Sequence, residues 1–316
     1  MHRSRISTCA RRGLAASAAA GVLLTPLAAA APASASVAPA RAANTQAGPA
    51  PATKAASAAV GGSKVVCTSQ KPGLAPELSH DIAGALKGRK GTAALAVYDR
   101  KTRTSCEFRA GAHFDSASVV KVTVLGALLR EAQEAHRKLT SREVKLTTAM
   151  ITKSDNDATS ALWSQLGVPR VKHFLALANM RHTVPGAGGA WGLTRITAAD
   201  ELTLMRLLTA KSAVLDAASR GYAQNLMAHV EADQKWGVPA GAPASATAHV
   251  KNGWLSRATD AWRVHSVGFI TGHGHDYGMT VLSSGNHTMA YGAATIEGAT
   301  RVVNRDLNSA VRAASH

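Results

Sequence analysis

The chain has 316 residues, of which 46% are hydrophobic and 4% aromatic, and its formal net charge is +17. The length permits one large domain or two small ones, with enough residues for a sizeable core. A basic chain suits polyanions, but the basic residues are dispersed and aromatic residues are few, which argues against a stacking platform for nucleic acid. We therefore expect no nucleic-acid partner, and an association with the anionic cell envelope instead.

The chain begins with the pattern of an export signal. Four arginines, the last two adjacent, precede an apolar stretch, and small residues at 33–35 offer a cleavage site. The apolar stretch is too short and too rich in alanine to span a membrane. We predict a signal peptide over 1–35 and a secreted mature chain without a transmembrane segment, exported by the ordinary secretory or the twin-arginine route.

Residues 36–64 are rich in Ala, Pro, Gly and Ser and contain almost no large apolar side chain. Such a composition buries too little surface to offset the cost of ordering the chain. We predict a disordered linker over 36–64 and one folded domain over 65–316. That domain contains Cys67 and Cys106, which we expect to form a disulfide in an oxidising compartment, with two buried free thiols as the alternative.

The folded domain begins and ends with strand patterns. Predicted strands, rich in β-branched and aromatic residues, cover 92–98, 103–108, 246–251, 262–271 and 276–283. Between the second and the third, from Val119 to Val230, apolar residues recur at helical spacing, and a last helix is expected over 290–313. We predict an α/β fold of the α+β type, with an antiparallel sheet of about five strands built from both chain ends, flanked by helices, and an inserted all-helical lobe. A site would lie in the groove between sheet and lobe.

Ser118 and Lys121 stand three positions apart where the helical region begins, so on a helix their side chains share one face. A serine hydroxyl is a weak nucleophile until a base takes its proton, and a lysine whose pKa is lowered by burial is such a base. At a helix N-terminus, the backbone N–H of Ser118 would also face a developing oxyanion. Alone, Ser-x-x-Lys is a frequent chance match.

Two further short motifs follow in the sequence. Ser154-Asp155-Asn156 comes after one helical run and before another, where the structural interpretation is a helix N-cap. Lys251-Asn252-Gly253 ends a predicted strand, and by itself it is an edge lysine followed by a turn.

In this order, the three motifs resemble the active-site set of class A β-lactamases and the related penicillin-binding D,D-peptidases. The resemblance covers nearly the whole predicted domain and implies a role for each motif residue. Ser118 would be the acylated nucleophile and Lys121 its base. Ser154 would relay a proton to the departing nitrogen, and Asn156 would position the substrate amide. Lys251 would keep Ser154 poised and attract the substrate carboxylate.

The resemblance also implies the substrate and its binding groups. The substrate would be a β-lactam or a D-Ala-D-Ala-like peptidoglycan stem peptide, and neither a cofactor nor a metal ion is implied. The backbone N–H groups of Ser118 and Trp254 would form the oxyanion hole. Asn252 and Gly253 would line the substrate, with Asn252 in place of the usual Thr or Ser. A metal site at His273 and His275 is an alternative that lacks further ligands.

One part of the family pattern is missing. Class A β-lactamases use an omega-loop glutamate to activate the water that hydrolyses the acyl-enzyme, whereas residues 179–199 contain no Asp or Glu. Asp200 fits a helix-capping box with Thr197, and His182 is the only conventional base in the interval. We therefore predict that acylation is intact and deacylation slow.

Some interpretations remain open at this stage. Arg257 or Arg263 would either contact a substrate carboxylate or be solvated surface arginines. Besides a β-lactamase-like hydrolase, the sequence allows a D,D-carboxypeptidase or penicillin-binding protein, or a non-catalytic module that captures cell-wall peptide or β-lactam.

Overall fold

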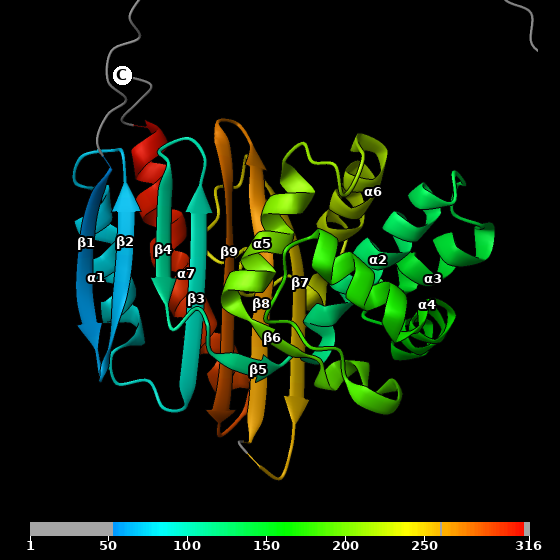
Figure 1. Ribbon diagram of the computed structural model, residues 1–316. Helices are drawn as coiled ribbons and strands as arrows, with labels where there is room; N and C mark the ends of the chain where they lie inside the picture. The colour runs from blue at the N-terminus through cyan, green and yellow to red at the C-terminus, as the bar shows by residue number, and fades with distance from the viewer. Residues whose placement is uncertain (1–52, 260, 313–316) are drawn as a thin grey trace, which may run out of the picture. The chain divides into compact units, whose positions relative to one another are not determined.

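An antiparallel sheet of seven strands organises the fold, in the order β1-β2-β4-β3-β9-β8-β7 (Figure 1). The computed structural model describes residues 53–259 and 261–312, so the predicted signal peptide and the linker as far as residue 52 lie outside the described residues. The strands are β1 (Lys54–Val60), β2 (Ser63–Ser69), β3 (Thr92–Asp99), β4 (Thr104–Phe108), β7 (Thr247–Ser256), β8 (Trp262–Gly272) and β9 (His275–Asn286). Neighbours pair antiparallel throughout, which confirms the predicted fold class.

Strand β1 and the start of β2 lie within residues 36–64, so the prediction of a disordered linker is wrong for this part. β1 consists mostly of small residues, but it pairs with β2 along its whole length. Ala56, Ala58 and Val60 alternate toward the core and are partly buried there. Backbone hydrogen bonds and alternate small side chains thus order a segment whose composition alone predicts disorder. The first strand of the described part begins at Lys54, and the hairpin adds two strands to the five expected.

The predicted disulfide is present. Cys67 on β2 and Cys106 on β4 are directly opposite in the register of the sheet, and their sulfur atoms are 2.07 Å apart. The bond joins the N-terminal hairpin, through β2, to β4 in the rest of the sheet.

Helices cover both faces of the sheet (Figure 1). They are α1 (Leu74–Leu86), α2 (Val120–Glu134), α3 (Ser141–Thr152), α4 (Asn156–Leu177), α5 (Ala198–Thr209), α6 (Ala217–Ala228) and α7 (Met289–Arg312). Strand β3 shows how the two faces divide: Leu95 and Val97 pack into the core beneath α1 and α7, whereas Ala94, Ala96 and Tyr98 pack into the core shared with the helical lobe. This alternation follows from the two-residue period of a strand.

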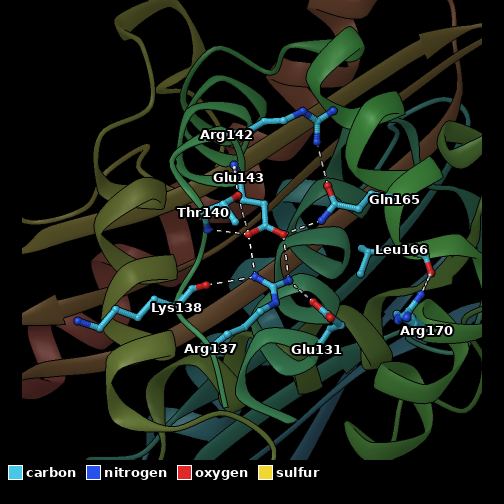
Figure 2. Close-up of polar contacts among 9 residues, drawn as sticks. All are labelled: Glu131, Arg137, Lys138, Thr140, Arg142, Glu143, Gln165, Leu166 and Arg170. Atoms are coloured by element: carbon cyan, nitrogen blue, oxygen red, sulfur yellow. Dashed lines mark hydrogen bonds and ion pairs between the residues drawn. The ribbon is translucent and has the colours of Figure 1, made fainter. Parts of the chain in front are cut away.

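A buried carboxylate ties the helical lobe together (Figure 2). Glu143, at the start of α3, is only 3% exposed, and its oxygens accept hydrogen bonds from Arg137 at 2.8 and 3.0 Å. Gln165 of α4 donates to it at 2.6 Å, and the backbone N–H of Thr140 at 2.8 Å. Arg137 also pairs with Glu131 of α2. The network therefore joins α2, α3 and α4.

Short elements connect the lobe to the sheet. They are β5 (His113–Asp115), β6 (Arg195–Thr197), and the 3-10 helices η1 (Ala117–Val119), η2 (Ala187–Gly189), η3 (Trp191–Leu193) and η4 (Ala232–Gln234). β5 and β6 pair antiparallel. Within the described residues, no helix has both the length and the apolar character to cross a membrane, and no group of three or more His, Cys, Asp or Glu side chains could hold a metal ion.

Candidate active site

Ser118 lies in η1, the tight turn between strand β5 and helix α2. Ala117, directly before it, has a φ of 47°, a left-handed conformation that costs a non-glycine residue about 1–3 kcal/mol. The backbone N–H of Ser116 donates to the carbonyl of Thr194 at 2.8 Å, which fixes this strained turn from outside. Val119 and Val120 are fully buried and anchor the other side. The half-buried Ser118 therefore has a backbone held in one conformation.

Gly253 of β7 lies directly against the backbone of this turn. A Cβ atom at residue 253 would be 2.7 Å from the backbone nitrogen of Ser118 and 2.8 Å from that of Val119. Only glycine permits this approach. The contact brings β7 against η1, while the predicted pairing of the Ser118 and Trp254 N–H groups stays a prediction.

Lys121, in the first turn of α2, is fully buried. Its Nζ donates to the backbone carbonyl of Ser154 at 2.6 Å, to Ser154 Oγ at 3.1 Å and to Asn156 Oδ1 at 2.8 Å. Within the described residues no hydrogen bond joins this amine to Ser118. Burial lowers the pKa of Lys121 to about 8, against the opposing charge of Asp155.

Lys251 approaches the same serine from the sheet. It is fully buried, and its Nζ donates to Ser154 Oγ at 2.9 Å and to the carbonyl of Asn252 at 2.9 Å. Burial, and secondly the nearby charge of Lys121, lower its pKa well below the usual value. No carboxylate forms an ion pair with either lysine in the part of the chain that the structure describes. The half-buried Ser154 thus places its Oγ between the amines of two fully buried lysines.

The Ser154-Asp155-Asn156 motif both caps a helix and builds the site. Asp155 is the N-cap of α4, and its side chain accepts from the N–H of Ala158 at 2.7 Å. Ser154 has a φ of 57°, again left-handed, and this turns its hydroxyl toward both lysines. The cap and the site therefore come from one local conformation.

Asn252 is oriented differently from the sequence expectation. Its Nδ2 donates to the carbonyls of Gln234 at 2.8 Å and Trp236 at 3.0 Å, so both amide hydrogens are already used. The side chain is 1% exposed. Asn252 therefore holds the loop after η4 against β7 and offers no free donor to a substrate carboxylate. Trp254, by contrast, is 36% exposed, with its ring 6.1 Å from that of Trp236.

Arg257 and Arg263, whose roles the sequence left undecided, both belong to an ion cluster around Asp115. Asp115 was not singled out from the sequence. Asp115 lies three residues before Ser118 and pairs with Arg257 at 3.0 Å and with Arg195 and Arg263 at 3.3 Å. Arg263 is 5% exposed, so the interpretation as a solvated surface arginine is wrong for this residue. Three guanidinium groups thus gather around one carboxylate that lies three residues before Ser118 in the chain.

The loop before α5 carries a second residue that the sequence did not single out. Trp191 of η3 places its ring 5.0 Å from Lys121 Nζ, measured to the ring centroid. His182, the alternative base, is exposed, and its contacts are with Asp200 and His113. The N–H of Asp200 donates to Thr197 Oγ1 at 3.1 Å, as the capping interpretation predicts. In the sequence, Trp191 stands out only as a large aromatic residue in a stretch rich in glycine, and this was the signal that could have identified it.

Comparisons with known proteins agree on one family. The sequence model of the beta-lactamase enzyme family matches residues 77–147 and 140–307. No curated protein sequence matches the chain.

Solved structures resemble the fold. A class A beta-lactamase from Bacteroides cellulosilyticus has a TM-score of 0.64 and 19% identity, covering 74% of this chain and 98% of its own. A beta lactamase from Xanthomonas campestris pv. campestris has a TM-score of 0.63 and 20% identity, covering 74% and 98%. A mutant of PBP-A, in an acyl-enzyme complex with penicillin G, has a TM-score of 0.63 and 17% identity, covering 74% and 96%. With the family match spanning most of the chain, this protein belongs to the beta-lactamase enzyme family.

Proposed function

We propose that the chain is a secreted serine hydrolase in which Ser118 is acylated by β-lactams or by D-Ala-D-Ala-like amides, and from which the acyl group is released slowly. The observation that carries this proposal is the meeting of the Lys121 and Lys251 amines at Ser154 Oγ, beside the turn that bears Ser118. Two buried lysines without a carboxylate partner are costly to keep. Amines with lowered pKa values are useful as bases near neutral pH, which gives a reason for keeping them.

In the acylation step, Ser118 Oγ attacks the substrate carbonyl carbon and forms a C–O bond. Its proton passes to the free amine of Lys121, one helical turn along α2. Lys121 Nζ already contacts Ser154 Oγ at 3.1 Å, so Ser154 can give its own proton to the departing nitrogen and recover one from the lysine. The C–N bond breaks, and the net proton transfer is from Ser118 to that nitrogen.

The binding groups suit an anionic amide. The N–H groups of Ser118 and Trp254 would stabilise the oxyanion, and each such donor is typically worth about 3 kcal/mol of barrier. The close approach of Gly253, next to Trp254, to the Ser118 backbone supports this assignment. Arg257, whose side chain is 39% exposed beside Asp115, would offer a guanidinium group to a substrate carboxylate.

Slow release of the acyl group is expected from the groups in the loop that faces Lys121. Residues 179–199 contain no carboxylate, and the described part of this loop presents Trp191 to the amine. A water molecule that attacks the acyl ester would therefore lack an anionic base. One fold neighbour, the PBP-A mutant, is itself an acyl-enzyme complex with penicillin G.

Intact-protein mass spectrometry with benzylpenicillin tests the proposal. We expect an adduct of the full penicillin mass that forms within minutes and decays slowly, that is lost in Ser118→Ala, and that persists in Ser164→Ala, a matched change at an exposed serine of α4. Absence of any covalent mass would leave the non-catalytic binding module as the better description. Rapid turnover to ring-opened product would contradict slow release.

A D,D-carboxypeptidase or penicillin-binding protein is the second candidate, favoured by the same lack of a water-activating carboxylate. Release of D-alanine from a peptide ending in D-Ala-D-Ala would identify it. Secretion, and association of the basic chain with the anionic envelope, belong to the same proposal, and the appearance of the processed protein in the culture medium would test the first of these.

A further inference from the structure

The Lys121 side chain is fully buried, and protein groups surround its Nζ on several sides. Its three hydrogen bonds all run to the turn before α4 and its first residue, to Ser154 and Asn156. The indole ring of Trp191 covers another side at 5.0 Å, within the range of a cation–π contact. The amine is fully buried as a result.

Trp191 is itself held in place from two directions. Its Nε1 donates to Ser160 Oγ of α4 at 3.1 Å, which fixes the plane of the ring. Its backbone carbonyl accepts from the N–H of Thr194 at 3.0 Å and from Ser116 Oγ at 3.4 Å. Because Ser116 lies two residues before the nucleophile, the loop and the nucleophile turn are tied together. The ring is therefore a built part of the site and not a surface side chain resting on it.

We propose that Trp191 shields the Lys121 amine from water and thereby sets the lifetime of the acyl-enzyme, an inference that rests on the proposed function. Hydrolysis of the ester requires a water oxygen to bond the acyl carbon while the bond to Ser118 Oγ breaks, with the water proton returning to that oxygen. A base must take the water proton on the way. Lys121 is the base that the proposed function assigns, and the indole ring lies over its amine at 5.0 Å, where it would hinder the approach of water.

Acylation does not need that side of the amine. The proton of Ser118 comes from η1, which leads directly into α2, and the relay through Ser154 uses contacts already made. Removal of the ring should therefore change the decay of the adduct much more than its formation. A merely structural role for Trp191 would affect both steps together, or the stability alone.

The experiment compares the parent chain with Trp191→Ala, Trp191→Phe and the control Ser164→Ala, using benzylpenicillin and intact-mass time courses. In Trp191→Ala we expect decay of the adduct to accelerate about tenfold or more, a small part of what a positioned base contributes, while formation changes by less than about threefold. The accelerated decay should rise with pH as Lys121 loses its proton, with a midpoint above that of the parent because removal of the ring relieves the burial that lowers the pKa of Lys121. Trp191→Phe keeps an apolar ring and should decay within about threefold of the parent.

Unchanged decay in a folded, acylated Trp191→Ala would overturn the shielding role and leave the proposed function intact. Equal acceleration in Trp191→Phe and Trp191→Ala would also overturn it, because the lost Ser160 contact and not the ring would then matter. Failure of the parent chain to form any adduct would instead refute the proposed function, and the shielding role with it. Thermal melts of each variant show whether it is folded, and Trp191→Phe serves as the second variant if Trp191→Ala is not.

Discussion

Two clusters of buried charge, one within the helical lobe and one where the lobe meets the sheet, are built in opposite ways. Around Glu143, every oxygen has donors, and a guanidinium with the opposite charge lies against it (Figure 2). Burial alone would raise the pKa of Glu143, but the bonds from Arg137, Thr140 and Gln165 outweigh it and lower the pKa to about 2. The native fold thus stabilises the charged form.

Around Lys121 and Lys251 the fold instead favours the uncharged form of the side chains. Both amines are buried, both are directed at Ser154 Oγ, and neither has a carboxylate partner among the described residues. Their pKa values fall because the charged form is poorly solvated. The Glu143 cluster therefore stabilises the fold, whereas the lysine cluster keeps two amines basic at a cost in stability. Mutations at Glu143 should mainly lower the free energy of unfolding, and mutations at the lysines should mainly slow acylation.

The largest expected effect is that of Lys121→Met. The variant removes the proposed base and should slow acylation by benzylpenicillin about 10³-fold. Because it also removes an uncompensated buried amine, we expect the free energy of unfolding to rise by about 1 kcal/mol despite the lost hydrogen bonds. Stopped mixing with mass detection gives the first quantity, and urea denaturation the second. A variant that is inactive and also strongly destabilised would show that Lys121 is a structural residue.

Glu143→Gln should lower the free energy of unfolding and leave acylation almost unchanged. Its lowered pKa means that Glu143 stabilises the fold above pH 4.5, and that this contribution is lost as the pH falls toward 2. The difference between 4.5 and about 2 corresponds to about 3 kcal/mol at pH 7, which the neutral amide would lose. Urea denaturation at pH 7 and pH 3 measures the loss, which should shrink at the lower pH. Acylation should stay within about twofold of the parent, and a large fall in acylation would mean that the two clusters are coupled.

The part of the site that could be predicted from sequence is the part that short motifs encode. Ser118, Ser154 and Lys251 are far apart in the chain, and only their order and their strand or helix context indicated that they meet. The structure joins Ser154 to Lys251 by a hydrogen bond and brings Gly253, two residues after Lys251, against the backbone of Ser118, while the catalytic roles stay predictions. The local signals were sound because helix capping at Asp155 and the close approach at Gly253 need particular residue types.

The residues that were missed act through tertiary position. Asp115 is a single acid before the nucleophile turn, and its three arginines come from three separate segments. Trp191 reaches Lys121 only because its loop is tied to Ser116 and Ser160. Strand β1 was missed because its alanines carry almost no hydrophobic signal, and its order comes from backbone pairing with β2. Pairing and contact across a fold have no local signature.

The smallest expected effect, and the sharpest test of the comparison, is the pH dependence of acylation. Lys121 must be unprotonated to accept the proton of Ser118, and its pKa is lowered from 10.5 to about 8. Below about pH 8 each pH unit should reduce the acylation rate constant about tenfold, and above it the rate should level off. A lysine with an ordinary pKa would instead give a rate that climbs to about pH 10. Since Glu143 titrates far below this range, Glu143→Gln should leave the midpoint near pH 8 unchanged, whereas a shifted midpoint would mean that charge in the lobe helps set the basicity of the site.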